Sequence, residues 1–184
     1  MWLLRICSEG KWDKEKLNVI EEAMGDLTLR EKVTDTGEVE KEKGLSVFRI
    51  TGQDKEAERI ALLFALDKRT KLGKICYILI PEEGLEALQL KTEFEDCPDL
   101  HSELRKRHYI IIGLEDEDKR RNLAKELLGT QKVAVIIQPE VIMKSKDIFK
   151  KDQELIEKIS ENIKKRNLKT SDLKKWEEIL EVIK

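Results

Sequence analysis

The sequence is poor in the residues from which disulfide frameworks and metal sites are built. It contains three cysteines and two histidines in 184 residues. No C-x-x-C pair occurs, so neither a disulfide framework nor a zinc ribbon is indicated. Cys7 and Cys76 lie in apolar, strand-like runs, and we expect them and Cys97 to be thiols rather than parts of a site. The sequence predicts no metal and no cofactor.

The chain also lacks an excess of either charge and any long apolar run. Its 36 basic and 38 acidic residues give a net charge of -2, which favours neither nucleic acid nor membrane as a general partner. No run of about 18 apolar residues exists, so no transmembrane helix is predicted. The short apolar patch at the N-terminus has no basic region before it, unlike a signal peptide. We therefore expect a cytoplasmic protein that does not bind membranes.

What the chain does have is charge and aliphatic side chains in equal measure. Forty per cent of the residues are apolar and 40% are charged. A chain of this length can bury a substantial core, and its net charge is too small for intrinsic disorder. Abundant Lys and Glu are typical of the surface ion-pair networks of thermophile proteins.

Hydrophobic periodicity predicts alternating strands and helices. The predicted strands cover residues 2–7, 28–36, 45–51, 74–80, 85–94, 108–113 and 132–137. The predicted helices cover residues 13–24, 54–69, 99–107 and 116–128, with Gly129 as a C-cap, followed by two helices from 147 to the end, broken near 167–170. Segments 48–84 and 109–141 share one strand–helix–strand pattern. That likeness reflects either an internal duplication or two βαβ units that follow the same local rules.

These elements predict an α/β protein, with α+β as the alternative. The start of the chain has the ferredoxin-like order β-α-β-β-α-β, and a further βαβ unit and a C-terminal helical hairpin follow. We expect a mixed sheet. The predicted units are a ferredoxin-like or mixed α/β unit over 1–96, a βαβ unit over 97–146 that continues the same sheet, and a helical tail over 147–184.

Three glycines stand between a predicted strand and a predicted helix, where phosphate-binding loops occur. They are Gly10, Gly52 and Gly113, and acidic residues such as Asp54 and Asp116 follow them. Acids at these positions cap the helix N–H groups and repel phosphate. Because neither G-x-G-x-x-G nor a Walker sequence is present, we expect capping rather than nucleotide binding.

One cluster brings histidine, cysteine and carboxylates close in sequence. Asp99, His101, Glu103 and His108 are the candidate catalytic residues, and a metal-dependent hydrolase or nuclease is the enzymatic alternative. The spacing matches no known ligand set. Pro98-Asp99 and Glu117-x-Lys119 formally resemble a metal-nuclease pattern, but Glu117 lies at a helix start rather than on a strand. Whether the protein is an enzyme stays open, and the sequence favours a non-enzyme.

The balanced net charge hides a polarity along the chain. Residues 82–118 hold twelve acids and four bases, whereas residues 144–175 hold eleven bases and six acids. The basic run KKRNLK (164–169) supplies candidate nucleic-acid contacts at Lys164, Lys165, Arg166 and Lys169. This run lacks aromatic residues for base stacking. Binding of RNA or DNA by the basic C-terminal helices is therefore the alternative rather than the main expectation.

The last predicted helix carries an apolar stripe at Leu173, Trp176, Leu180 and Ile183, which must be covered. The stripe could be covered by the chain's own sheet, by a second copy of the chain or by another protein. We therefore expect a protein-interaction or regulatory module that is homo-oligomeric or has a protein partner.

The stretch KVAVIIQPEVIMKSKDIF (132–149) is similar in pattern to a segment of the small subunit of the KEOPS tRNA-modification complex that binds the kinase of that complex. The similarity covers less than a fifth of the chain, and the order of elements elsewhere departs from that family. It therefore implies no role for any residue here.

Overall fold

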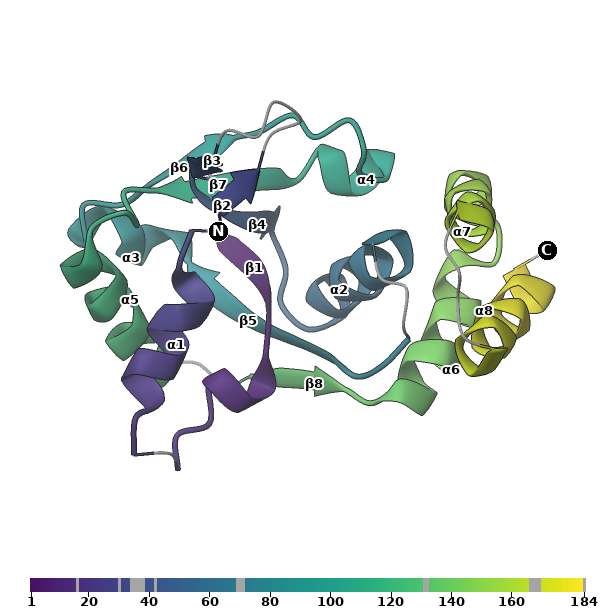
Figure 1. Cartoon of the computed structure of the whole chain (residues 1–184), viewed down its shortest axis with the longest axis horizontal. Coiled ribbons are helices and arrows are strands. Elements are labelled where there is room, and N and C mark those ends of the chain that lie inside the picture. The colour runs from purple at the N-terminus through teal and green to yellow at the C-terminus, as the bar shows by residue number, and fades with distance from the viewer. Residues whose placement is uncertain are drawn as a thin grey trace.

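A six-stranded sheet with helices on both faces forms the centre of the computed structural model (Figure 1). The structure describes residues 1–15, 17–29, 31–33, 39–41, 43–68, 72–130, 133–165 and 170–183. The strand order is β6-β7-β4-β1-β5-β8. The strands are β1 (Trp2–Cys7), β4 (Leu45–Ile50), β5 (Ile75–Pro81), β6 (Lys91–Phe94), β7 (His108–Ile112) and β8 (Ala134–Ile136). The α/β class is confirmed.

Every pairing in this sheet is antiparallel, where a mixed sheet was expected. Strands β4 and β5 both run opposite to β1, which lies between them. They are therefore parallel to each other, and helix α2 (Lys55–Lys68) connects them across β1. The predicted strand–helix–strand unit exists, but its two strands are not neighbours.

The second predicted strand–helix–strand unit also exists, and its two strands flank those of the first in the sheet. Strands β7 and β8 are also parallel to each other, and helix α5 (Glu117–Thr130) connects them across three strands. Both connections lead toward the side of the sheet on which β8 lies, but β4 and β7 point in opposite directions. Crossovers of the same hand must then lie on opposite faces of the sheet. Figure 1 shows this arrangement, with α2 and α5 on opposite sides of the strands.

The two faces bury separate cores because side chains alternate along each strand. In β5, Ile75 and Tyr77 enter the core beneath α2, whereas Cys76 and Ile78 enter the core beneath α5. The α2 core also receives residues of α4 (Ser102–Arg105), α6 (Gln138–Phe149), α7 (Gln153–Lys165) and α8 (Thr170–Ile183). The α5 core receives residues of α1 (Val19–Leu27) and α3 (Glu82–Ala87). The chain therefore covers both sheet faces itself.

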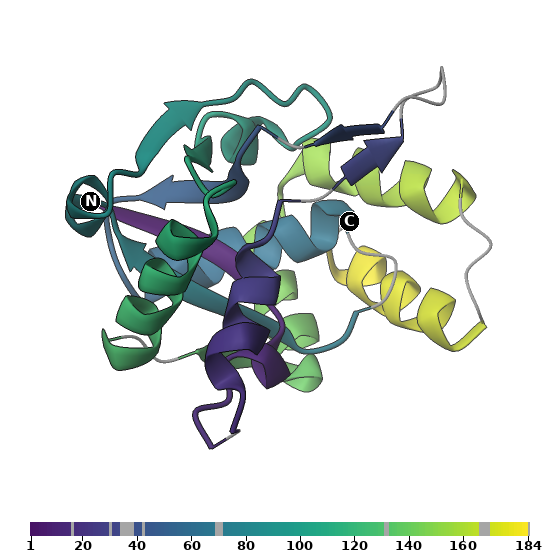
Figure 2. The ribbon, with the colours of Figure 1, turned by 60° about the vertical axis from the view of Figure 1, so that its left-hand side comes forward.

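The segment between α1 and β4 departs from the ferredoxin-like expectation. The strand expected over 28–36 is the short β2 (Glu31–Val33), which pairs with β3 (Val39–Lys41) in a separate two-stranded sheet. Figure 2 shows this hairpin apart from the main sheet. Strand β7, from much later in the chain, pairs with β4 on the side away from β1.

The first helical region begins later than the periodicity indicated. A 3₁₀ turn, η1 (Glu9–Lys11), precedes a turn segment, and α1 begins only at Val19. Leu17, predicted on the buried face of a helix over 13–24, is fully exposed. Trp12 instead enters the α5 core and donates its indole N–H to Asp26 over 2.9 Å.

Three further boundaries differ. The strand expected over 85–94 is helix α3 followed by the shorter β6. Helix α5 continues through Gly129 to Thr130, whose hydroxyl donates to the Glu126 carbonyl over 2.8 Å. Between β8 and the two expected tail helices lies α6, so the described tail holds α6, α7 and α8.

No helix in the described ranges is long and apolar enough to cross a bilayer. Strands β7 and β8 belong to the same sheet as β1, β4 and β5. The division into units at 96 and 146 stays a prediction.

Candidate functional site

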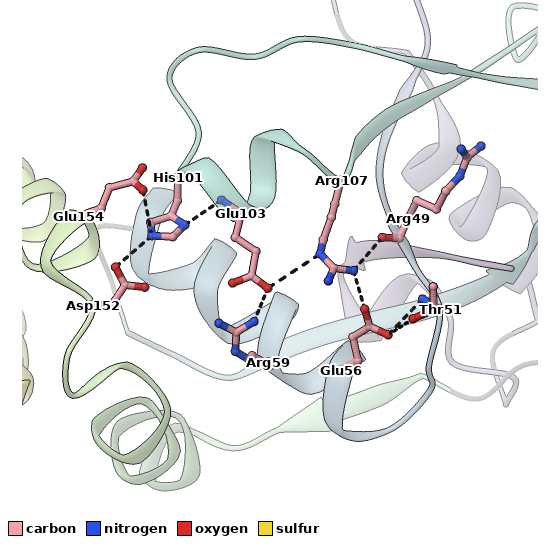
Figure 3. Close-up of polar contacts among 9 residues, drawn as sticks. All are labelled: Arg49, Thr51, Glu56, Arg59, His101, Glu103, Arg107, Asp152 and Glu154. Carbon is pink, nitrogen blue, oxygen red and sulfur yellow. Dashed lines mark hydrogen bonds and ion pairs between the residues drawn. The ribbon is translucent and has the colours of Figure 1, made fainter.

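The buried His101 lies where the tail meets a polar network that extends toward the sheet (Figure 3). Its Nδ1 accepts the N–H of Glu103 over 3.2 Å and so caps helix α4. Its Nε2 lies 3.1 Å from Oδ1 of Asp152 and 3.5 Å from Oε2 of Glu154. Because Nδ1 is an acceptor, these bonds assign the proton to Nε2, which donates to Asp152. Both ring nitrogens are thus used within the fold.

The two carboxylates that face His101 belong to the start of α7. Asp152 also accepts the N–H of Leu155 over 3.0 Å, and Glu154 accepts the N–H of Ser102 over 2.7 Å. Burial opposes ionisation of Glu154, but the hydrogen bonds from Ser102 outweigh it and, together with the nearby Lys158 ammonium, lower the pKa of Glu154. The N-termini of α4 and α7 therefore share capping groups, which fastens the tail to the segment before β7.

A buried carboxylate from α2 completes this junction. Asp67 accepts the backbone N–H of His101 over 3.1 Å, and the ammonium of Lys158 lies 3.3 Å from its other oxygen. Lys68 and Lys158 both donate to the carbonyl oxygen of Asp99, over 2.7 and 3.1 Å. The negative charge of Asp67 is thereby compensated, as a buried ion requires.

A second branch of the network runs along α2 toward the Gly52 loop. Glu103 pairs with Arg59 and with Arg107, and Arg107 pairs with Glu56. Glu56 turns back over the loop and accepts the N–H groups of Thr51 and Gly52, over 3.1 and 2.5 Å. Burial would raise the pKa of Glu56, but the Gly52 N–H, the Thr51 hydroxyl and Arg107 together lower it.

This arrangement fills the loop in which a phosphate would have to sit. The sequence pointed to Asp54 as the cap, but Asp54 has a φ of +53° and the carboxylate over the loop belongs to Glu56. At the Gly113 loop the expectation holds, because Asp116 accepts the N–H groups of Asp118 and Lys119 over 2.9 and 3.3 Å.

The second candidate histidine has different partners. His108 Nε2 lies 2.7 Å from the Ser46 hydroxyl, and Nδ1 lies 3.0 Å from the Glu95 carbonyl oxygen. Its ring packs against Phe48, with the centroids 5.7 Å apart. The structure thus brings His101 and Glu103 into one network but places His108 in another, and the exposed Asp99 enters the first through its carbonyl. Among the described residues, no group of three His, Cys, Asp or Glu is arranged to hold a metal ion.

Fewer basic side chains of the tail are available to bind phosphates than its composition indicates. Arg166, Lys169 and the side chain of Lys165 lie outside the described residues, while Lys164 is exposed. Four other bases of the tail form ion pairs: Lys144 with Glu58, Lys146 with Glu178, Lys158 with Asp67, and Lys175 with Asp172. Glu157 and Glu161 are also exposed on α7. The charge available to phosphates is correspondingly reduced.

The apolar stripe of α8 faces the molecule's own core. Trp176 is only 3% exposed and lies in the α2 core with Ile179, and Leu180 packs against that core. Leu173 is half-buried, and the side chain of Ile183 lies outside the described residues. The α2 core thus covers the aromatic residue that was predicted as an interface candidate.

Exposed apolar side chains gather instead at β8 and α6, a feature that the sequence analysis did not single out. Of the seven large apolar side chains that are exposed in the described ranges, four are Val135, Ile137, Met143 and Ile148. Ile137 is 53% exposed and Met143 is 57% exposed. Strand β8 is an edge of the sheet, so within the described part of the chain no strand pairs with the backbone groups on its outer side. We call Val133–Ile137 and Met143 the β8 edge.

No protein-family model, curated protein or solved structure matches this chain, so the arguments for its function come from its own residues.

Proposed function

We propose that the protein is an interaction module that forms a symmetric dimer through the β8 edge. The observation that carries this proposal is the concentration of exposed apolar side chains on an edge strand without charges. Residues 133–137 read VAVII, with no ionisable side chain. An uncharged apolar edge strand pairs readily with a further strand.

The opposite edge of the same sheet is built differently. Strand β6 presents the exposed charges of Lys91 and Glu93, and the exposed Glu95 and Asp96 follow it. Charged side chains on an edge strand are a common defence against pairing with another sheet. The chain therefore protects one edge and leaves the other unprotected, which is expected if the unprotected edge is covered in the assembled protein.

A second copy of this chain fits the edge better than a charged partner. A two-fold axis perpendicular to the sheet would place two β8 strands side by side and antiparallel, which continues the pairing found throughout the sheet. The uncharged segment would meet itself without repulsion between like charges. Standard interfaces bury about 800 Å² on each partner, which is more than so short a strand provides. Helix α6 must then contribute, through Met143.

Sedimentation velocity over a wide range of protein concentration tests this proposal. The wild-type chain should be a dimer, and Ile137→Lys should be a monomer, because each lysine would place a charge in the apolar interface. Leu17→Lys makes the same change at a fully exposed position outside the edge and should remain a dimer. Circular dichroism would verify that each variant is folded. A monomeric wild type, or a dimeric Ile137→Lys variant, would refute the proposal.

A further inference from the structure

Two of the three cysteines are direct partners across neighbouring strands. In the antiparallel pair of β1 and β5, Cys7 stands opposite Cys76. Sixty-eight residues separate them in the sequence, so no spacing rule could have paired them. Both are present as thiols. Residues that are directly opposite project to the same side of a sheet, and both side chains enter the α5 core.

The type of pair follows from the other end of the same ladder. Glu82 donates its N–H to the Met1 carbonyl over 3.2 Å, and its neighbour Pro81, which has no N–H, stands opposite Trp2. Trp2 and Pro81 therefore form a pair without mutual hydrogen bonds. Pair types alternate along an antiparallel ladder, and the register from Trp2 to Cys7 is unbroken. Cys7 and Cys76, five steps along, are a hydrogen-bonded pair.

This pair type fixes the approximate separation of the two residues. The Cα atoms of a hydrogen-bonded pair are about 5.5 Å apart, within the range of about 4.4–6.8 Å that a disulfide spans. Their Cβ atoms are up to about 5.5 Å apart, whereas a disulfide holds Cβ atoms about 3.5–4.5 Å apart. Closing the bond requires the strands to approach by roughly 1 Å. Cys7 is the last residue of β1, where the strand is least constrained.

We propose that Cys7 and Cys76 form a reversible intramolecular disulfide in the folded protein, by exchange with a small disulfide such as oxidised glutathione. One cysteine thiolate attacks the small disulfide, forms a mixed disulfide and releases one small thiol. The second cysteine, after losing its proton, attacks the protein sulfur of that mixed disulfide and releases the second small thiol. Two protein thiols are oxidised, and one small disulfide is reduced to two thiols. This inference is independent of the proposed dimer.

The geometry favours a reversible bond over a permanent one. A disulfide that holds its strands closer than the sheet prefers is strained, and strain makes it more reducible. The thiols are 8% and 4% exposed, so the first attack is slow and proceeds when the end of β1 opens. Cys97 packs against the α2 core, on the other side of the sheet.

Two variants that each keep two thiols provide a matched test. Cys97→Ser retains Cys7 and Cys76, whereas Cys7→Ser retains Cys76 and Cys97. Each folded variant is brought to equilibrium in glutathione buffers of increasing oxidised fraction and examined by intact-mass and peptide mass spectrometry. Cys97→Ser should lose two hydrogen atoms, yield one peptide pair joined through residues 7 and 76, and recover when reduced. Cys7→Ser should yield only mixed disulfides with glutathione or unmodified thiols.

The result that would overturn the proposal is equally specific. It is a Cys97→Ser variant that carries glutathione on both cysteines, links two chains, or keeps both thiols in the most oxidising buffer. An intramolecular disulfide in Cys7→Ser would equally overturn it, because the pairing would then not follow the strand register. Circular dichroism recorded in each buffer shows that the reacting species is folded.

Discussion

Replacing Trp176 by alanine tests whether α8 belongs to the fold of a single chain. The indole is almost fully buried in the α2 core, where Ile179 and Phe149 are also buried. Truncating a buried Trp removes its transfer free energy and leaves a cavity, which costs about 3 to 5 kcal/mol. For a chain of this size, such a loss lowers the unfolding midpoint by on the order of 10 °C.

The assay is urea unfolding followed by far-ultraviolet circular dichroism at two protein concentrations. The loss in the free energy of unfolding should be the same at both protein concentrations, because the cavity lies within one chain. Trp176→Phe should cost less, since much of the apolar surface is retained. Lys174→Ala, at an exposed position of the same helix, should change the free energy of unfolding by less than about 0.5 kcal/mol. A loss below about 1 kcal/mol for Trp176→Ala, or one that grows on dilution, would contradict this placement.

Two further variants address the polar network. His101→Ala removes the cap of α4 and the donor to Asp152, so it should lower the free energy of unfolding by about 1 to 3 kcal/mol. His101→Asn should recover part of this free energy because Asn also caps helices. Equal losses for the two variants would argue against the capping role. Glu56, whose pKa is lowered in the folded protein, contributes stability above its unfolded pKa of about 4.3. That contribution disappears as the pH falls through the lower folded value. The free energy of unfolding, measured from neutral pH to about pH 2, should therefore fall less steeply with acid for Glu56→Gln than for the wild type. An unchanged slope would contradict the bonds that Glu56 makes to Thr51, Gly52 and Arg107.

The core strands were predictable because their apolar runs have no competing interpretation. Residues 2–7, 45–51 and 74–80 form β1, β4 and β5 within a residue of the expected bounds. The pairing partners were not predictable, because the apolar runs of a sheet covered on both faces are the same for parallel and antiparallel neighbours. Only the long-range register distinguishes these two arrangements.

Two helices were missed for one physical reason. The strands predicted over 74–80 and 132–137 end shortly before Pro81 and Pro139, and no helix was predicted to start at either proline. A proline nevertheless suits the start of a helix, where its missing N–H is no loss. Helix α3 begins directly after Pro81, and Pro139 lies in the first turn of α6. In both places Pro is followed by Glu, whose charge favours a helix N-terminus.

The candidate site was only partly visible in the sequence. His101 and Glu103 were singled out, but their partners Asp152, Glu154 and Arg59 are distant along the chain. Charged residues are so frequent that no pattern distinguished these three from the rest. The pairing of Cys7 with Cys76 was invisible for a different reason, since it depends on strand register alone.

The central place of β1 has a consequence for how this chain folds during synthesis. Strand β1 leaves the ribosome before β5, whose pairing with β1 extends to Pro81, opposite Trp2. The ladder between β1 and β5 therefore cannot form until that later segment has emerged, and loop closures of this length slow folding. Once formed, β1 is hydrogen-bonded on both sides, so its amide protons should be among the last to exchange with solvent.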